Sequence, residues 1–298
     1  MGQYGPVPIL LAVIAVLGVS ASGPLMAATT APALAIAFWR NAGGAALISP
    51  FALTRNRVEL RGIDRSTWLK CALAGAMLAG HFACWVSALK LTSVASATAL
   101  VTTQLIWVVL IDRLTGARTT RAVLIGMGLS IGGVLVISGF DFSVSGRAIG
   151  GDGLAIAGGL FAALYLVVGN DIRKTLSTTT YTFACYWACA IILAAAALVF
   201  GIPFGGYSAK SWFLIAAVTV AAQLLGHSLL NHLLAVMSPI LISLIILLEV
   251  PGAALLAGIF LGQTPPWGVY AGLVLILLGL AVVATNRDRP ATDVVLAE

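Results

Sequence analysis

Long apolar runs, separated by short gaps that hold most of the charged residues, constrain this chain more than any other feature. Each run has about 18–24 residues, enough for a helix to cross the roughly 30 Å hydrocarbon core of a bilayer. Of the 298 residues, 60% are hydrophobic and only 9% are charged, whereas roughly a quarter of the residues of soluble domains are charged. The period-two alternation of a membrane β-barrel is absent. The sequence therefore predicts an all-α membrane protein.

Ten transmembrane helices are predicted from these runs. The N-terminal run follows no basic segment and precedes no cleavage site, so it is interpreted as the first helix rather than a signal peptide. The breaks contain proline, glycine or charged residues. The predicted helices cover residues 7–27, 32–53, 67–89, 93–112, 120–139, 150–170, 179–201, 211–234, 238–261 and 267–285.

The basic residues predict an orientation. Most of the 16 lysines and arginines lie in loops 54–66, 113–121 and 171–177 and in the C-terminal tail. The loops on the other side contain only Lys90, Arg147 and Lys210. By the positive-inside rule, both termini then lie in the cytoplasm, and the protein is expected in the cytoplasmic (inner) membrane.

The two halves of the chain align at an offset of 146 residues. Gly80-His81 falls on Gly226-His227, and from there the register holds without a gap over about 60 residues. Further aligned pairs are Gly116 with Gly262, Gly126 with Gly272, Leu129 with Leu275, Gly133 with Gly279, and Val136 with Val282. One offset over such a length indicates an internal duplication.

The duplication predicts an inverted repeat. Residues 1–145 form the first five-helix repeat, 146–286 the second, and 287–298 a cytoplasmic tail. An odd number of spans forces the second repeat into the opposite orientation, and its loops carry the opposite charge bias. Secondary transporters are commonly built this way, with the substrate site near the midplane where the repeats meet.

Composition and motifs disfavour several other functions. The net charge of +6 comes from residues scattered at helix ends, so no nucleic-acid partner is expected. The four cysteines fall inside predicted helices and are interpreted as packing residues. The chain has no Walker loop, no nucleophile–base set and no metal-ligand spacing, so no ATP drive, enzyme activity, cofactor or metal is expected.

Two charged residues are predicted at membrane depth, where ionisable groups usually face a cavity or a partner. Glu249 lies near the middle of the ninth span. It is expected either to couple protons or bind a substrate amine, or to satisfy backbone groups freed by Pro251. Arg40, in the second span, could hold a substrate carboxylate, pair with Glu249, or extend to the outer surface. A structural or gating role is favoured for it.

The paired histidines are the strongest candidates for a cavity lining. His81 and Trp85 share one face of the third span, and Gln223, His227 and Asn231 share one face of the eighth. The repeat relates the two faces. The alternative is interhelical hydrogen bonding, with Gly80 and Gly226 permitting close approach.

Other polar and aromatic residues extend this candidate site. Gln104 and Trp107 on the fourth span and Tyr165 on the sixth are predicted to add to the lining, since aromatic walls suit apolar or cationic solutes. Gly23-Pro24 in the first span predicts a kink that could serve as a gate hinge, and Pro251 is grouped with it as a gating residue.

Several segments resemble one known family. These are AIAFWRN at 35–41, LIWVVLIDRLTGAR at 105–118 and LEVPGAALLAGIFLGQ at 248–263, the last two each followed by a glycine-spaced helix. Together they resemble the EamA-type ten-helix transporters of the drug/metabolite transporter superfamily. The family's proline is Leu105 in the first copy, and its glutamate is Ala117 and Gln263 in the two copies. These departures put in doubt any mechanism assigned to those acids.

The resemblance implies an exporter of small organic metabolites, such as amino acids, that works by alternating access, with possible proton coupling. The chain is expected to act as a monomer or weak dimer in a lipid bilayer. One alternative is a facilitative uniporter of nucleobase-like or quaternary amine solutes. Another, of a different class, is a membrane-embedded lipid-processing enzyme.

Overall fold

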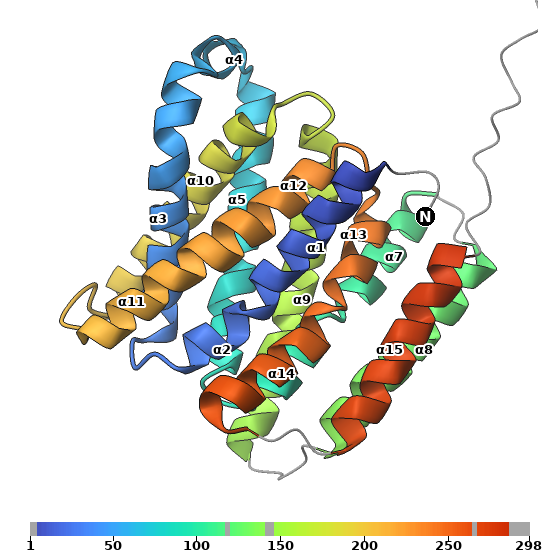
Figure 1. The fold of residues 1–298 in the computed structure, drawn as a ribbon. Helices are drawn as coiled ribbons and strands as arrows, with labels where there is room; N and C mark the ends of the chain where they lie inside the picture. The colour runs from blue at the N-terminus through green and yellow to red at the C-terminus, as the bar shows by residue number, and fades with distance from the viewer. Residues whose placement is uncertain (1–4, 117–119, 141–145, 264–266, 286–298) are drawn as a thin grey trace, which may run out of the picture.

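The computed structural model describes residues 5–116, 120–140, 146–263 and 267–285, and every regular element in these ranges is a helix (Figure 1). The predicted breaks at 141–147 and 264–266, together with Arg118, Arg287, Arg289 and the tail, fall wholly or largely outside these ranges. In the first half the helices are α1 (Pro6–Ser20), α2 (Ser22–Ala27), α3 (Ala33–Thr54), α4 (Arg57–Gly62), α5 (Arg65–Ala88), α6 (Val94–Val101), α7 (Gln104–Leu114) and α8 (Arg121–Phe140).

The second half contains one element that departs from α-helical geometry. Its helices are α9 (Gly146–Ile172), α10 (Thr178–Val199), α11 (Ala209–Val218), η1 (Thr219–Ser228), α12 (Leu229–Leu233), α13 (Pro239–Ile246), α14 (Glu249–Leu261) and α15 (Trp267–Thr285). The element η1 is a π-helix that continues α11 into α12. Such helices are rare and are often found at functional sites.

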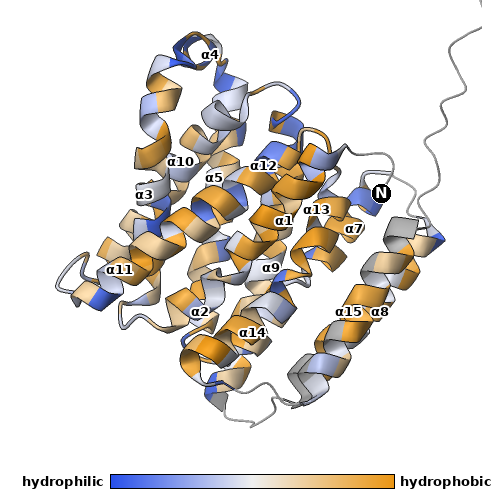
Figure 2. Ribbon diagram, viewed as in Figure 1, coloured by the Kyte–Doolittle hydropathy of each residue, from blue (hydrophilic) through white to orange (hydrophobic). Residues whose placement is uncertain are grey.

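Seven segments of the described chain are long and apolar enough to cross a membrane, which makes this a multi-pass membrane protein. Figure 2 shows apolar residues along the helix bodies and polar residues gathered around α4. The segment α3 is not among the seven, because Arg40 and Asn41 lower its hydropathy. The described apolar parts of α8 and α15 are shorter helices, Arg121–Val136 and Tyr270–Gly279. That all ten predicted segments span the membrane stays a prediction.

Serine side chains begin several of these helices. Ser93, Ser177, Ser208 and Ser238 each accept a hydrogen bond from the backbone N–H three residues on, at the starts of α6, α10, α11 and α13. Asp64 does the same for α5. A side-chain oxygen at this position satisfies a backbone donor that has no partner inside the helix.

Two helical segments are interrupted at equivalent places in the two halves. The break between α6 and α7 lies at Thr102–Thr103, and the break between α13 and α14 lies at Leu247–Leu248. These positions differ by the 146-residue offset to within one residue. The first segment is also broken, at Ala21, so the predicted kink is present, although Pro24 itself lies inside α2.

The helices pack into two main groups. In the α9 group, α9 contacts α5, α6 and α7; in the α1 group, α1 contacts η1, α12, α13, α14 and α2. Each group therefore combines helices from both halves of the sequence. The pair α3 and α10 packs against α5, with α3 also touching η1, whereas α8 and α15 pack mainly against one another (Figure 1).

Glycines permit the closest helix contacts. A Cβ added at Gly133 would lie 2.5 Å from the carbonyl oxygen of Gly272, and one at Gly279 would lie 2.5 Å from that of Gly126. Hence α8 and α15 meet backbone to backbone at repeat-equivalent positions. Gly80 likewise faces Phe161 of α9, and Gly226 faces Val19 of α1.

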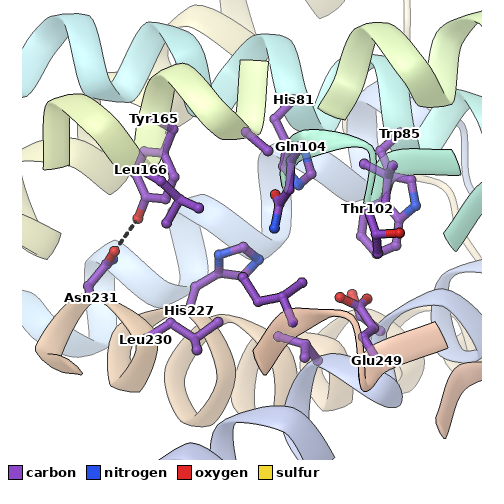
Figure 3. Close-up of a pocket in the computed structure, with 15 residues that line it drawn as sticks. His81, Trp85, Thr102, Gln104, Tyr165, Leu166, His227, Leu230, Asn231 and Glu249 are labelled. Carbon is purple, nitrogen blue, oxygen red and sulfur yellow. Dashed lines mark hydrogen bonds between the residues drawn. The ribbon is translucent and has the colours of Figure 1, made fainter. Parts of the chain in front are cut away.

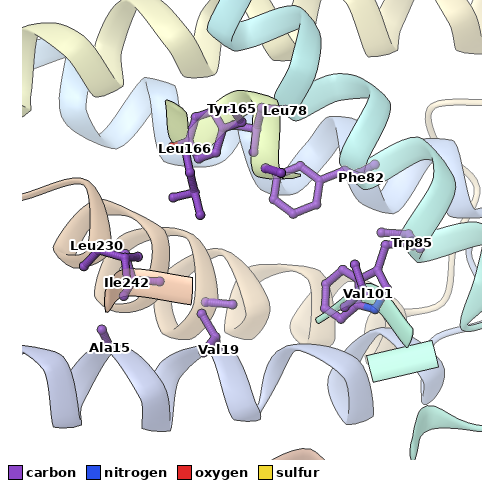
Figure 4. Packing of buried hydrophobic residues seen from close by; sticks show 14 of the residues in the cluster. Ala15, Val19, Leu78, Phe82, Trp85, Val101, Tyr165, Leu166, Leu230 and Ile242 are labelled. Carbon is purple, nitrogen blue, oxygen red and sulfur yellow. The ribbon is translucent and has the colours of Figure 1, made fainter. Parts of the chain in front are cut away.

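Equivalent helices end at opposite ends of the bundle. The loop after α9 lies beside α4, where Asn56 Nδ2 donates to Ser177 Oγ at 2.9 Å. The loop after α2 lies at the other end, where Thr30 Oγ1 and Ser211 Oγ are 3.1 Å apart. The apolar core between the groups includes Val19, Phe82 and Leu230 (Figure 4).

Candidate functional site

A small cavity lies between the α9 group and the α1 group (Figure 3). Its volume is about 30 Å³, which is room for a few water molecules. The α9 group lines it with His81, Trp85, Val101, Thr102, Gln104, Ala162, Tyr165 and Leu166. The α1 group lines it with Val19, Ser22, His227, Leu230, Asn231, Ile246 and Glu249. The lining was predicted to come from the third, fourth, sixth, eighth and ninth segments. The first segment also contributes, through Val19 and Ser22.

His81 is held in a fixed orientation on the α5 wall. Its Nδ1 lies 3.0 Å from the carbonyl oxygen of Gly158 on α9, and since a carbonyl can only accept, Nδ1 carries a proton. The ring stacks on Trp85 with centroids 5.7 Å apart. The sequence offered two alternatives for His81, an interhelical hydrogen bond or a place in the cavity wall. In the structure, His81 does both.

His227 comes from the opposite wall. Its ring centroid lies 6.2 Å from that of His81 and 5.3 Å from that of Phe82. The two repeat-related histidines thus face one another across the cavity (Figure 3). This places both halves of the sequence repeat at one site.

Three buried donors in the cavity wall have no protein partner. They are Trp85 Nε1, Gln104 Nε2 and Asn231 Nδ2. Asn231 is anchored by its oxygen, which accepts a 2.7 Å hydrogen bond from Tyr165 Oη (Figure 3). An unsatisfied buried donor is costly, so these groups favour a ligand or water that offers acceptor oxygens.

Glu249 supplies a carboxylate to the same cavity. It is the first residue of α14, directly after the α13–α14 break, and it is only 6% exposed. A negative charge is favoured at a helix N-terminus, where backbone N–H groups are free. Its acceptor oxygens complement the nearby donors, so the wall offers groups of both kinds.

Arg40 forms no ion pair with Glu249, one of the three options considered for it. Arg40 is fully buried and donates from Nε to Gln223 Oε1 at 3.0 Å and from Nη1 to Ser22 Oγ at 3.1 Å. Its guanidinium also lies 4.1 Å from the centroid of Phe82. Arg40 therefore joins α3, α2, α5 and η1 behind the cavity wall, consistent with the structural role favoured from the sequence.

Gln223 does not line the cavity with His227 and Asn231. Its Nε2 donates to Asn41 Oδ1 at 3.0 Å, and its carbonyl accepts from Tyr186 Oη at 3.3 Å and from Ser228 Oγ at 3.1 Å. The reason is the π-helical winding of η1, which changes the angular spacing of residues four apart. An α-helical reading of this segment could not show that.

Other predicted residues also lie away from the cavity lining. Trp107, Pro24 and Pro251 are not among the lining residues, although each belongs to a helix that contributes to it. Ser22 and Thr102 were missed. Ser22 lies in the Ser-Gly-Pro region already noted for its break, whereas Thr102 stands at a helix break with no glycine or proline to indicate it.

The comparisons with known proteins agree with this architecture. The profile of the EamA-like transporter family matches residues 7–139 and, a second time, residues 149–285. The chain belongs to the EamA-like transporter family. This confirms the resemblance to the EamA-type branch of the drug/metabolite transporter superfamily, and the double match shows two EamA repeats. Members of this family are transporters, which disfavours the lipid-processing alternative.

A solved structure titled only "Crystal structure of protein" has the same fold. It aligns with a TM-score of 0.74 at 19% identity, over 95% of this chain and 98% of the other. At that identity the likeness concerns the fold alone. A search of curated proteins finds no match.

Proposed function

We propose that this EamA-family transporter is a secondary exporter of small organic metabolites with an amine and a carboxylate, such as amino acids. The observation that carries the proposal is the cavity wall, which combines the carboxylate of Glu249 with three unpartnered donors. The carboxylate suits an ammonium group, and Trp85, Gln104 and Asn231 suit the oxygens of a carboxylate. The stacked His81 and Trp85 add an aromatic face for a side chain.

The proposed mechanism is alternating access between the two helix groups. Support comes from their matched make-up, since the 146-residue offset carries α5, α6 and α7 onto the eighth and ninth segments and α1 onto α9. Equivalent helices that end at opposite ends of the bundle further support an inverted ten-helix repeat, as in other transporters. Rocking of one group against the other would expose the cavity to each side in turn.

The orientation is proposed from charge. Arg55, Arg57, Arg61 and Arg65 lie around α4, on the side that would face the cytoplasm. This gives a protein of the cytoplasmic membrane with both termini inside, acting as a monomer or weak dimer. Export follows from the family resemblance.

Flux in proteoliposomes tests the proposal. Purified protein is expected to move labelled amino acids down an imposed gradient, faster than protein-free liposomes. Absence of flux for every amino acid, with monodisperse folded protein, would reject the substrate class.

Proton coupling is proposed for Glu249, whose carboxylate can take up and release a proton within the cavity. Substituting Glu249→Gln keeps the shape and removes the titration, so the pH dependence of flux is expected to disappear. Glu59→Gln, a carboxylate outside the cavity, is the matched control. Unchanged pH dependence in E249Q would favour uniport instead.

A second candidate substrate is a quaternary amine or a nucleobase-like solute. The aromatic face of Trp85 near a carboxylate is an arrangement that attracts organic cations. Competition distinguishes the two candidates. Full inhibition of transport by a quaternary amine, with no inhibition by amino acids, would favour the second candidate. That candidate corresponds to the facilitative uniporter considered from the sequence.

A further inference from the structure

At each end of the bundle, a basic side chain of the α9 group bridges to the α1 group. At the end away from α4, Lys90 Nζ donates to the carbonyl oxygens of Met26 at 2.9 Å and Thr29 at 2.6 Å. Lys90 follows α5, whereas Met26 and Thr29 lie at the end of α2. This contact therefore joins the α9 group to the α1 group.

Arg173 makes the corresponding contact at the α4 end. It follows α9, and its Nε donates to the carbonyl oxygen of Asn231 on α12 at 2.9 Å. Its other nitrogens donate to the carbonyl of Leu176 and to Thr178 Oγ1, and Thr178 Oγ1 lies 3.0 Å from His232 Nδ1. Arg173 is only 7% exposed.

The two contacts share one chemistry. In each, a cation of the α9 group is bonded to backbone carbonyl oxygens at or near the C-terminal end of a helix in the α1 group, where the helix dipole favours positive charge. Hydrogen bonds from charged donors are stronger than neutral ones. Since the cavity lies between the same two groups, opening it to either side requires one of these contacts to break.

We propose that Lys90 and Arg173 are the two latches of the transport cycle, Lys90 closing the outer end and Arg173 the cytoplasmic end. This inference rests on the proposed alternating access and deepens it. Release of one latch while the other stays closed gives each open state, and the present structure, with both made, is the occluded one.

The bundle supplies matched controls. Arg147 Nη2 donates to the carbonyl of Lys90 at 3.0 Å, and Lys70 Nζ bonds Asp171 Oδ2 at 2.7 Å. Both are basic residues, one at each end, but both bond within the α9 group. Their loss removes the same charge without releasing the α1 group.

Side-specific labelling tests the latches without knowledge of the substrate. The parent has Cys71, Cys84, Cys185 and Cys189 replaced by alanine and carries Thr102→Cys as a reporter in the cavity wall. A membrane-impermeant maleimide is applied to right-side-out or inside-out vesicles. Lys90→Gln is expected to raise the labelling rate from the outside, and Arg173→Gln from the cytoplasmic side, each by about tenfold, the order expected for loss of a charged hydrogen bond.

Arg147→Gln and Lys70→Gln are expected to label at the parent rate, as are the conservative Lys90→Arg and Arg173→Lys, which keep a donor. The proposal would be overturned if a latch variant raised labelling equally from both sides, if both latch variants raised it from the same side, or if the controls changed it as much. If Lys90→Gln does not fold, a cross-link takes its place. Thr29→Cys and Lys90→Cys are joined by a bifunctional maleimide, which holds the outer contact closed. That link is expected to abolish outside labelling and keep cytoplasmic labelling; unchanged outside labelling overturns the outer latch.

Failure of the latches and failure of the proposed function give different results. Side-specific labelling without flux of any amino acid rejects the substrate class and keeps the latches. Flux that is normal in both latch variants, with unchanged labelling, rejects the latches and keeps the transporter.

Discussion

At the scale of single residues, polar and aromatic side chains from both helix groups converge on one cavity. His81, Trp85, Gln104, Tyr165, His227, Asn231 and Glu249 all line it. A polar side chain in an otherwise apolar membrane helix indicates a cavity or a polar partner, because burying it among apolar groups is costly. That signal does not give direction around the helix, which is why Gln223 was predicted to line the cavity although it bonds to Arg40 behind the wall.

Two tryptophans of the α9 group, Trp85 buried and Trp107 partly buried, give a residue-scale test. Trp85 and Trp107 both have an unpartnered indole N–H, but only Trp85 lines the cavity. Trp85→Phe removes one ligand donor and is expected to raise KM for amino-acid flux by about tenfold, the order of one hydrogen bond. Trp107→Phe is expected to leave KM within about twofold by the same reasoning. Equal effects would mean that the indole of Trp85 does not contact the solute.

At the scale of helices, positions were predictable and internal breaks were not. Apolar length and charged gaps set where segments begin and end. The α6–α7 break falls in the sequence VTTQ, without glycine or proline, so local propensity did not reveal it. The π-helix η1 was missed for a related reason: no proline indicates it, and the Gln223 carbonyl within it accepts from Tyr186 of α10 and from Ser228 of η1 itself.

The α8–α15 contact gives a test at this scale. A Cβ at Gly133 would lie too close to the Gly272 carbonyl, whereas Gly132 has open space around its Cβ position. Gly133→Ala is expected to destabilise the protein by about 1–3 kcal/mol through overpacking. Gly132→Ala, on the same helix, is expected to be neutral or slightly stabilising. Thermal unfolding in detergent measures both; equal unfolding temperatures for the two variants would argue against this helix contact.

The contact of α4 with α10 predicts a pH effect. Burial alone would raise the pKa of Glu59, but hydrogen bonds from Ser177, Thr180 and Asn56 outweigh it and hold that pKa below its ordinary value. A lowered folded-state pKa contributes stability above the unfolded pKa, and that stability is lost as pH falls through the folded pKa.

Glu59→Gln is therefore expected to cost about 1 kcal/mol or less at neutral pH, because the carboxylate is partly exposed. The difference between parent and variant should shrink on acidification toward pH 4 and below. Unfolding measured across this range checks it, with Asp112→Asn, a partly exposed carboxylate on α7 away from α10, as the control. A difference that stays constant with pH would contradict the assignment.

At the scale of the whole molecule, the fold class and the duplication followed from pattern alone. Apolar runs of membrane length define an all-helical membrane protein, and a single offset reveals two repeats. Neither pattern says how ten segments sort into groups. The grouping depends on which helix faces are complementary in shape, as where Gly80 of α5 accommodates Phe161 of α9. Such complementary residues lie far apart in the sequence, so a local pattern does not show which of them meet.

Orientation is testable at this scale. In a cysteine-free parent, Arg55→Cys beside α4 is expected to react with an impermeant maleimide only from the cytoplasmic side. Lys210→Cys, exposed at the other end, is expected to react only from the outside. Labelling of whole cells and inside-out vesicles measures both, and reaction of position 55 in intact cells would reverse the proposed topology.

The acceptors that Lys90 and Arg173 reach on the α1 group are backbone oxygens, supplied by residues 26, 29 and 231. Replacing the side chains at these positions leaves the oxygens in place. Each contact can thus be lost by mutation on one partner only, and no compensating change can arise on the other. Among descendants of this chain, selection would therefore act on each basic residue alone. A search for covarying residue pairs would not link either basic residue to the helix end that it binds.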